Sequence, residues 1–236
     1  MPRKEKSKPP LVRGERVTLE IDGLNHAGEG VGDVEGFTVF VPGTAPGDLV
    51  AAEVISVKPS YARALLISLE RPSPRRVEPF CGYFGRCGGC HLQHIDYAEQ
   101  LRLKRQIVAE TLRRIGGLEV PVAPVLGMPD PRHYRNKYQA PVAAENGQVR
   151  VGLYELRSHR VVELSQCPIQ HPAGDRAVAA ARQALQELRI PPYDEQSRRG
   201  VVRHIIARTS FATGEVLLAL VTSGRKLPRA ARLVEL

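Results

Sequence analysis

The sequence predicts a mixed β and α+β protein, in which a small OB-like β-barrel is followed by an α+β domain. Three observations predict it: short β-rich segments within the first 70 residues, a Pro-rich segment at 71–79, and mixed helix and strand patterns after that segment. With 236 residues, of which 42% are hydrophobic, the chain has enough apolar material for two small domains. The expected division is a disordered basic tail at 1–10, the barrel at 11–69, a linker at 70–80 and the second domain at 81–236.

The barrel is expected from four segments rich in β-branched and apolar residues, at 16–21, 37–41, 49–57 and 64–69. Turns rich in Gly, Pro and Asp separate them. Several short strands at this spacing are typical of an OB-type barrel, a fold that often binds nucleic acid. The Gly-rich stretch at 28–36 lacks the full dinucleotide-binding spacing and precedes a strand, so it predicts a hairpin loop and not a phosphate-binding loop.

One long helix is expected near the start of the second domain, over residues 97–115. Asp96 and Glu99 have the spacing of a capping box, and Gly116-Gly117 provide the stop. The expected apolar stripe has five members: Leu101, Ile107, Val108, Leu112 and Ile115.

Strands and a second helix are expected after Pro131. Residues 133–142 and 149–156 form a hairpin across Asn146-Gly147, the strongest short hairpin signal. A strand at 159–164 and an Ala-rich helix at 175–188 follow. A last hairpin pairs 201–210 with 215–221, and no element is assigned to 225–236.

The charge is uneven along the chain, and its distribution indicates a polyanionic partner. The formal net charge is +9, made up of +4 in residues 1–16, −6 in residues 17–70 and +11 in residues 71–236. Most basic residues are Arg, whose planar guanidinium suits bidentate phosphate contacts, although solvated surface charge is the alternative. No run approaches the roughly 18–20 apolar residues that span a bilayer, so we expect a soluble cytoplasmic protein without a membrane partner.

All four cysteines fit one metal-ligand pattern: Cys81, Cys87, Cys90 and, much later, Cys167 followed by Pro168. Four thiolates are the ligands of a [4Fe–4S] cluster or of an all-cysteine zinc site. Zinc ribbons usually use two Cys-x2-Cys knuckles, whereas this chain has one, so the spacing favours iron–sulfur. Zinc and four unrelated buried cysteines stay open on spacing alone. His91 and His94, beside the knuckle, are interpreted as packing residues because the thiols already number four.

Four stretches carry a family resemblance: Cys81 to Lys104, Tyr134-Arg-Asn-Lys137, Ser158-His159-Arg160 and Cys167-Pro168. They resemble the RNA (uracil-5-)methyltransferases, in the branch that has a [4Fe–4S] cluster and an N-terminal TRAM domain. The barrel segment, with its turn from Phe37 to Asp48, is similar to that TRAM domain. The resemblance covers almost the whole chain and implies an iron–sulfur second domain rather than a zinc-binding one.

The resemblance implies an enzyme, but this sequence departs from the family in its catalytic parts. Family members add a C-terminal domain that binds S-adenosylmethionine, and a cysteine thiolate there attacks C6 of uracil before C5 takes the methyl group. Here all four cysteines belong to the cluster pattern, and 223–236 cannot hold such a domain. We therefore expect a fragment or truncated product that neither binds S-adenosylmethionine nor methylates RNA by itself.

Within that family scheme, this chain is expected to recognise RNA. The candidate phosphate contacts are Arg132, Arg135, Lys137, Arg157 and Arg160, and Asn136 is the candidate contact to a base or ribose. The alternatives are that these residues face solvent or pair with Glu155 and Glu163, and that Lys137 and Tyr138 are structural. The resemblance favours 23S ribosomal RNA over transfer RNA, and a monomer is expected.

Two other functions compete with this one. The first is a stand-alone iron–sulfur RNA-binding module without catalytic activity. The second is an electron carrier, which is the weaker of the two because the cysteines supply one cluster and the sequence shows no signal for docking a redox partner.

Overall fold

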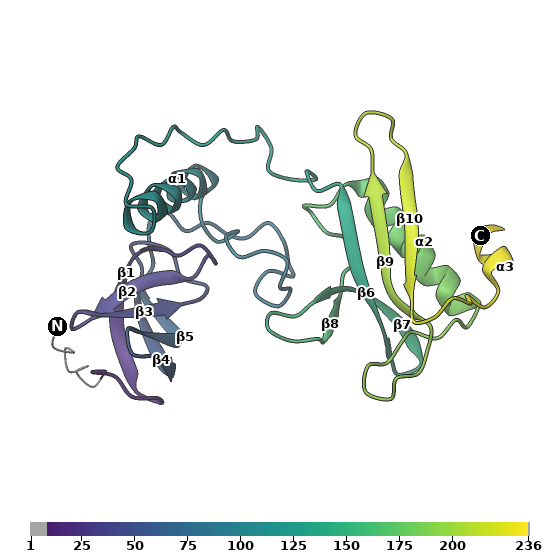
Figure 1. Ribbon diagram of the computed structural model, residues 1–236, viewed down its shortest axis with the longest axis horizontal. Helices are drawn as coiled ribbons and strands as arrows, with labels where there is room; N and C mark the ends of the chain where they lie inside the picture. Colours follow the sequence, from purple (N-terminus) through teal and green to yellow (C-terminus); the bar gives the residue numbers. More distant parts are fainter. Residues whose placement is uncertain (1–8, 236) are drawn as a thin grey trace. The chain divides into compact units, whose positions relative to one another are not determined.

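The computed structural model describes residues 9–235, so residues 1–8 of the expected tail and residue 236 lie outside it. The chain forms two compact units (Figure 1): residues up to 79 join 91–127 in the first, and 80–90 join 128 onward in the second. The sequence pattern placed 91–127 in the second domain. In the structure this segment packs on the barrel, because Ile95 and Leu103 share a small apolar cluster with Ala45.

The first unit contains a closed five-stranded barrel, which confirms the expected barrel. Its strands are β1 (Arg16–Leu24), β2 (Gly30–Val34), β3 (Phe37–Val41), β4 (Leu49–Val57) and β5 (Tyr61–Arg71). They close in the order β1-β2-β3-β5-β4, with β3 and β5 parallel and the other pairs antiparallel. Alternate residues point inward and form a core of small and β-branched side chains, among them Val17, Ile21, Val39, Val41, Val50, Val54, Ala62 and Ala64.

Strand β2 corrects the expectation that 28–36 is only a hairpin loop. Gly30 and Gly32 belong to the strand, and both lie where the backbone approaches its neighbours closely. A Cβ on Gly30 would collide with Thr44 Oγ1, and a Cβ on Gly32 would collide with the carbonyl oxygen of Glu20. The glycines therefore permit close strand packing.

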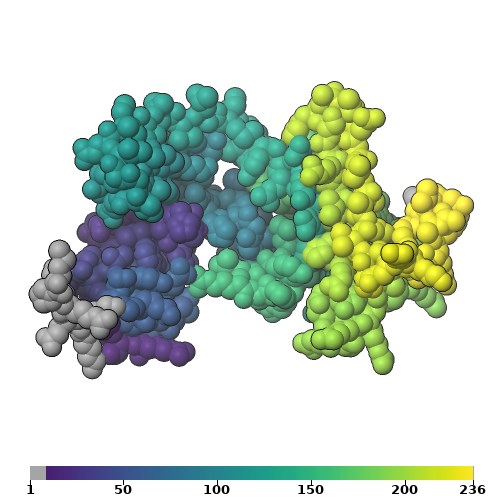
Figure 2. Space-filling view, in the orientation of Figure 1, coloured from purple at the N-terminus to yellow at the C-terminus, as the bar shows by residue number. Residues whose placement is uncertain are grey.

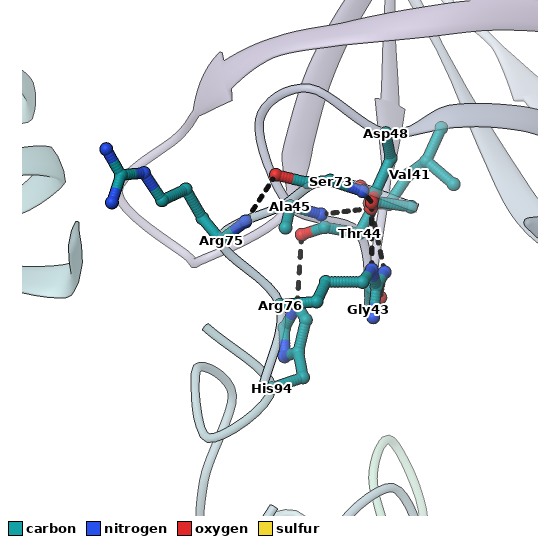
Figure 3. Close-up of polar contacts among 9 residues, drawn as sticks. All are labelled: Val41, Gly43, Thr44, Ala45, Asp48, Ser73, Arg75, Arg76 and His94. Atoms are coloured by element: carbon teal, nitrogen blue, oxygen red, sulfur yellow. Dashed lines mark hydrogen bonds and ion pairs between the residues drawn. The ribbon is translucent and has the colours of Figure 1, made fainter. Parts of the chain in front are cut away.

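The Pro-rich linker is anchored to the barrel through Asp48, which is fully buried (Figure 3). Arg76 donates from Nε to Asp48 Oδ1 at 2.8 Å and from Nη2 to Oδ2 at 2.7 Å. The amides of Ala45 and Ser73 donate to the same carboxylate at 2.6 and 2.8 Å. Burial acts to raise the pKa of Asp48, but these hydrogen bonds and the charge of Arg76 outweigh it, so its pKa lies below its usual value.

His94 joins the same anchored region and has the packing role expected for it. Its Nε2 donates to the carbonyl oxygen of Thr44 at 3.1 Å, and Val77 donates its amide to the carbonyl of His94 at 3.0 Å. Only 3% of His94 is exposed, and burial lowers its pKa. Residues 73–77 are therefore a packed part of the first unit.

Helix α1 (Tyr97–Arg114) confirms the expected helix, but its apolar stripe is only partly used. The Asp96 side chain accepts from the amide of Glu99, as expected of a cap. Leu103 is the buried apolar side chain, whereas Val108 and Ile115 of the expected stripe are 48% and 84% exposed. In Figure 2 the teal atoms of this part of the chain lie against the purple atoms of the barrel.

The second unit is an antiparallel sheet with one helix packed on a face. Its sheet order is β10-β9-β6-β7-β8, and α2 contacts β7 and β9. The elements are β6 (Lys137–Glu145), β7 (Gln148–Tyr154), β8 (Val161–Glu163), α2 (Pro172–Glu187), β9 (Val202–Thr209), β10 (Val216–Thr222) and α3 (Ala230–Glu235). All the helices and strands expected in this unit are present. The strand that was expected to start at residue 133 begins at Lys137, and α3 is a helix that the sequence did not predict. Asn146 and Gly147 have φ of 52° and 76°, which confirms the predicted hairpin turn.

No helix among residues 9–235 has the length and apolar character needed to cross a membrane.

Candidate functional site

The loop that carries three of the cysteines is held against the end of β7. Gly88 donates its amide to the carbonyl of Tyr154 at 2.9 Å, and Cys87 forms an antiparallel bridge with Glu155. A Cβ on Gly88 would lie 3.0 Å from that carbonyl oxygen, so glycine allows the loop to approach this closely. The loop is thereby positioned by the sheet of the second unit.

A second set of contacts ties this loop to the segment that leads to Cys167. The hydroxyl of Tyr83 lies 2.9 Å from Ser165 Oγ and accepts from the Ser165 amide at 3.2 Å. Cys167 is buried, and its amide donates to Asp175 Oδ2 at 3.0 Å, at the start of α2. Residues about 80 apart in the sequence are therefore held together, as the cysteine pattern requires.

Electrostatic interactions link Cys87 to Cys81 and Cys90, and Cys167 to Cys90. Burial raises the pKa of Cys87, the amide of Gly89 lowers it, and the charges of Cys90 and Cys81 raise it further. Burial raises the pKa of Cys167 to about 11, with a further contribution from Cys90. Without a nearby cation these two thiols are protonated at neutral pH, so a metal would have to displace their protons.

The donor set fits an iron–sulfur cluster chemically. Across residues 9–235, no three His, Cys, Asp or Glu side chains are grouped so that they could hold a metal ion. The four thiols supply the right ligand type, and main-chain amides reach the sulfurs, as Gly89 does to Cys87 Sγ at 3.4 Å. The residues therefore supply the ligand type that a cluster needs.

The expected RNA contacts divide into two places in the second unit. Arg135 is half-buried. It lies near the cysteine loop, where its positive charge lowers the pKa of Cys87. Arg132 lies over the ring of Phe80, 5.4 Å from its centroid. Asn136 and Lys137 continue from there into β6, and the Asn136 carbonyl accepts from the amide of Thr209.

Arg157 and Arg160 lie in the turn between β7 and β8. Arg160 forms a two-point ion pair with Glu155, which is the pairing alternative considered from the sequence. Glu163 instead pairs with Arg150. Arg157 adopts a φ of 58° within the turn.

One basic residue was missed by sequence reasoning. Arg208 on β9 lies directly opposite Lys137 on β6, and both side chains are exposed. Within residues 9–235, neither of them has an ion-pair partner, and neither does Arg135. The sequence carried no signal for Arg208, because the pairing of β6 with β9 joins residues about 70 positions apart.

Two kinds of comparison place these observations among known proteins. The TRAM domain family matches residues 10–67, which covers all of the barrel except the end of β5. An uncharacterized RNA methyltransferase of Clostridium tetani is 40% identical over 225 residues, and one of Listeria monocytogenes is 42% identical over 218 residues. These alignments cover 95% and 92% of this chain, but only 49% and 48% of the two relatives.

A solved structure shows the same fold relationship. The crystal structure of Pyrococcus abyssi tRNA (uracil-54, C5)-methyltransferase, in complex with S-adenosyl-L-homocysteine, superposes with a TM-score of 0.63 at 27% identity. The match covers 91% of this chain and 48% of that protein, so the chain spans about half the length of the proteins it matches. The chain is therefore similar over most of its length to about half of these RNA methyltransferases, and its residues 10–67 match the TRAM domain family.

Proposed function

We propose that this chain recognises RNA on behalf of an S-adenosylmethionine-dependent methyltransferase that modifies C5 of a uridine. The similarity to RNA methyltransferases extends over more than nine tenths of the chain, and the Pyrococcus abyssi enzyme acts on uracil C5 of a tRNA. The observation that carries the proposal is the group of three cations without ion-pair partners within residues 9–235, Arg135, Lys137 and Arg208. Cations free to neutralise phosphates are the main source of affinity for RNA.

We infer that this chain does not itself transfer the methyl group. All four cysteines fit the metal-ligand pattern, so we assign none of them as a nucleophile, and S-adenosylmethionine is not expected to bind this chain. The purified chain, incubated with RNA and S-adenosylmethionine labelled in its methyl group, should transfer no label. Label in the RNA would contradict this division of labour.

We assign the cysteines Cys81, Cys87, Cys90 and Cys167 as ligands of a [4Fe–4S] cluster. When bound, the cluster would replace the thiol protons with iron and tie the cysteine loop to the start of α2. Protein purified without oxygen should be brown and contain about four irons per chain, as four-cysteine ligation implies. Colourless protein that contains zinc would favour the zinc alternative.

The RNA surface is tested by removing two of its cations together. Arg135→Ala/Lys137→Ala should bind RNA more weakly and with a shallower dependence on salt, because about two phosphate contacts are lost. Arg232→Ala is the matched control, since Arg232 lies on α3 and pairs with Glu235. Equal binding by the double variant and the control would remove these residues from the site.

For the RNA itself, we propose 23S ribosomal RNA ahead of transfer RNA. Unlabelled fragments of each should be compared as competitors for the same labelled complex, at one salt concentration. Stronger competition by transfer RNA would reverse this order and leave the proposed RNA-recognition role unchanged.

A further inference from the structure

The second unit contains a cavity that the proposed RNA surface does not include. It has a volume of about 460 Å³, which is within the range of small-molecule sites. It lies between α2 and the sheet (Figure 1), and its remaining wall comes from Tyr83 of the cysteine loop and from the segment that follows β8. None of the four cysteines lines it, so the cavity is distinct from the candidate cluster site.

One face of α2 forms a wall of the cavity. Asp175, Val178, Ala179 and Arg182 line it, and their spacing of three, four and seven residues from Asp175 places them on one side of the helix. Arg182 lies two turns beyond Asp175, about 10 Å along the helix axis. This wall therefore has a charged group at each end and small apolar side chains between them.

The charged groups at the Arg182 end of the cavity are already paired. Glu163 lines the cavity, and it pairs with Arg182 at 3.5 Å and with Arg150. Arg150 also pairs with Glu145 at 3.2 Å. The charges of these four side chains sum to zero, so this end presents no net charge to a ligand.

The opposite end contains a carboxylate oxygen without a partner. Asp175 is half-buried, and its Oδ2 accepts from the amide of Cys167 at 3.0 Å. No donor or cation among residues 9–235 pairs with its Oδ1. Burial raises the pKa of Asp175 by more than the Cys167 amide and the charge of His133 lower it, and the His133 ring lies 3.0 Å from the carbonyl oxygen of Gln170 instead. A cation beside Asp175 would favour its charged form.

A buried hydroxyl without a partner also borders the cavity. Tyr138 on β6 is only 4% exposed, and no hydrogen bond joins its hydroxyl to any other group in the described part of the chain. The hydroxyl oxygen is not fully enclosed, so the cavity gives access to it. Burial raises the pKa of Tyr138, which keeps the hydroxyl protonated at neutral pH. Because buried tyrosine hydroxyls usually have a hydrogen-bond partner, this one indicates a ligand with a polar group.

We propose that this cavity binds a primary ammonium group carried on a short apolar chain. The ammonium donates to Asp175 Oδ1 and to the hydroxyl oxygen of Tyr138, and the apolar chain packs on Val151 and Val178. The inference goes beyond RNA recognition and does not depend on it.

Other small ligands fit the cavity less well. An anion would lie beside the unpaired carboxylate of Asp175, which repels it. A magnesium or calcium ion takes about six to eight oxygen ligands, whereas apolar side chains such as Val151, Leu164 and Val178 form much of the lining. The ammonium needs only a few acceptors, and its hydrocarbon chain suits the apolar part of the wall.

The experiment measures the affinity of n-butylammonium for the whole 236-residue chain by saturation-transfer NMR, at neutral pH and constant ionic strength. The neutral 1-butanol, of the same length, should bind at least about tenfold more weakly, because it lacks the charge-assisted hydrogen bond. Equal binding of the two probes would show that the cavity does not select a cation, and would overturn the proposal.

Two substitutions test the proposed polar contacts. Asp175→Asn keeps an oxygen for the Cys167 amide but removes the charge, and should weaken n-butylammonium binding about tenfold. Tyr138→Phe removes one hydrogen bond and should weaken it about fivefold. The matched controls are Glu187→Gln, on an exposed position of α2, and Tyr134→Phe, whose side chain is 44% exposed; both should bind as the original chain does.

A third variant tests the place of binding without altering a polar group. Ala179→Leu fills the cavity with a larger apolar side chain and should abolish binding, while circular dichroism confirms that the variant is folded. Unchanged binding by folded Ala179→Leu would place the probe elsewhere and overturn the proposal, whether or not the Asp175 variant folds. Displacement of the probe by magnesium chloride, but not by sodium chloride of the same ionic strength, would identify a divalent cation as the ligand and overturn it as well.

A second probe distinguishes two sources of the ammonium group. Nα-acetyl-lysine amide carries the same group on a peptide-like body. Tighter binding of this probe than of n-butylammonium would assign the cavity to a lysine side chain of a protein, and weaker binding would assign it to a free amine. Both results support recognition of an ammonium group, provided that Asp175→Asn weakens each probe.

Discussion

The ion pair between Arg76 and Asp48 makes a quantitative prediction about the stability of the first unit. Arg76→Ala removes two hydrogen bonds to a carboxylate that has no solvent exposure, and a third to the carbonyl of Gly43. Removing one partner of a buried pair leaves the other charge uncompensated, at a cost of about 3–5 kcal/mol. The amides of Ala45 and Ser73 still bond the carboxylate, so we expect the lower end, about 3 kcal/mol.

The free energy of unfolding is measured by urea denaturation, followed by circular dichroism. The matched control is Arg71→Ala, because Arg71 makes an exposed pair with Glu20 at 3.7 Å, with side chains 63% and 58% exposed. Exposed pairs of this kind contribute at most about 1 kcal/mol. Similar losses of stability in both variants would refute the assignment of Asp48 and Arg76 as the anchor of the linker.

The same ion pair has a defined pH dependence. The pKa of Asp48 in the folded protein lies below its usual value, so the unfolded chain binds this proton more readily than the folded protein. The contribution to stability is therefore complete above the unfolded pKa of about 3.9, and it is lost as the pH falls through the lower folded pKa. Consequently the stability difference between the original chain and Arg76→Ala should shrink below about pH 4. A difference that does not change with pH would contradict the ionised state of Asp48.

Three further predictions concern other parts of the molecule. Gly32→Ala should destabilise the barrel by more than about 2 kcal/mol, because the new Cβ would collide with the carbonyl oxygen of Glu20. Gly23→Ala is the control: no atom lies near its Cβ position, so it should destabilise the barrel by less than about 1 kcal/mol, and thermal unfolding compares the two variants. Leu103→Ala should lower the free energy of unfolding by about 3 kcal/mol in urea denaturation, because the side chain is 2% exposed. Val108→Ala should lower it by less than about 1 kcal/mol, and equal losses would mean that Val108 contributes to packing as the sequence pattern predicted. Cys167→Ser should lower the iron content of anaerobically purified protein, and an unchanged content would remove this residue from the cluster ligands.

Local sequence signals predicted the elements that depend on local physics. The cap at Asp96, the stop after α1 and the Asn146-Gly147 turn all involve neighbouring residues, and the structure contains each of them. Short segments rich in β-branched and apolar residues, separated by turns, likewise predicted most barrel strands. Strand β2 was not predicted, because glycines lower strand propensity. In the structure these glycines allow β2 to pack closely against Thr44 and the backbone of β1.

The candidate sites could be predicted only in part from the sequence. The cysteine spacing and the basic residues from Arg132 to Lys137 stand out because they are close together along the chain. Arg208 was missed, since only strand pairing brings it opposite Lys137. The packing of α1 on the barrel was missed for a similar reason, because the sequence pattern assigned this helix to the second domain.

By itself, then, the sequence determined the types of element, the ligand chemistry of four thiols and the concentration of positive charge beyond residue 70. These are properties of residue type and short-range spacing, which no later folding step changes. Only the tertiary structure decided which charges remain without partners, because Glu155 neutralises Arg160 and leaves Arg135 and Lys137 available. It also decided that Arg76 anchors the linker and that α1 packs against the barrel. Burial and long-range packing create those relationships, and neither is a property of any single stretch of sequence.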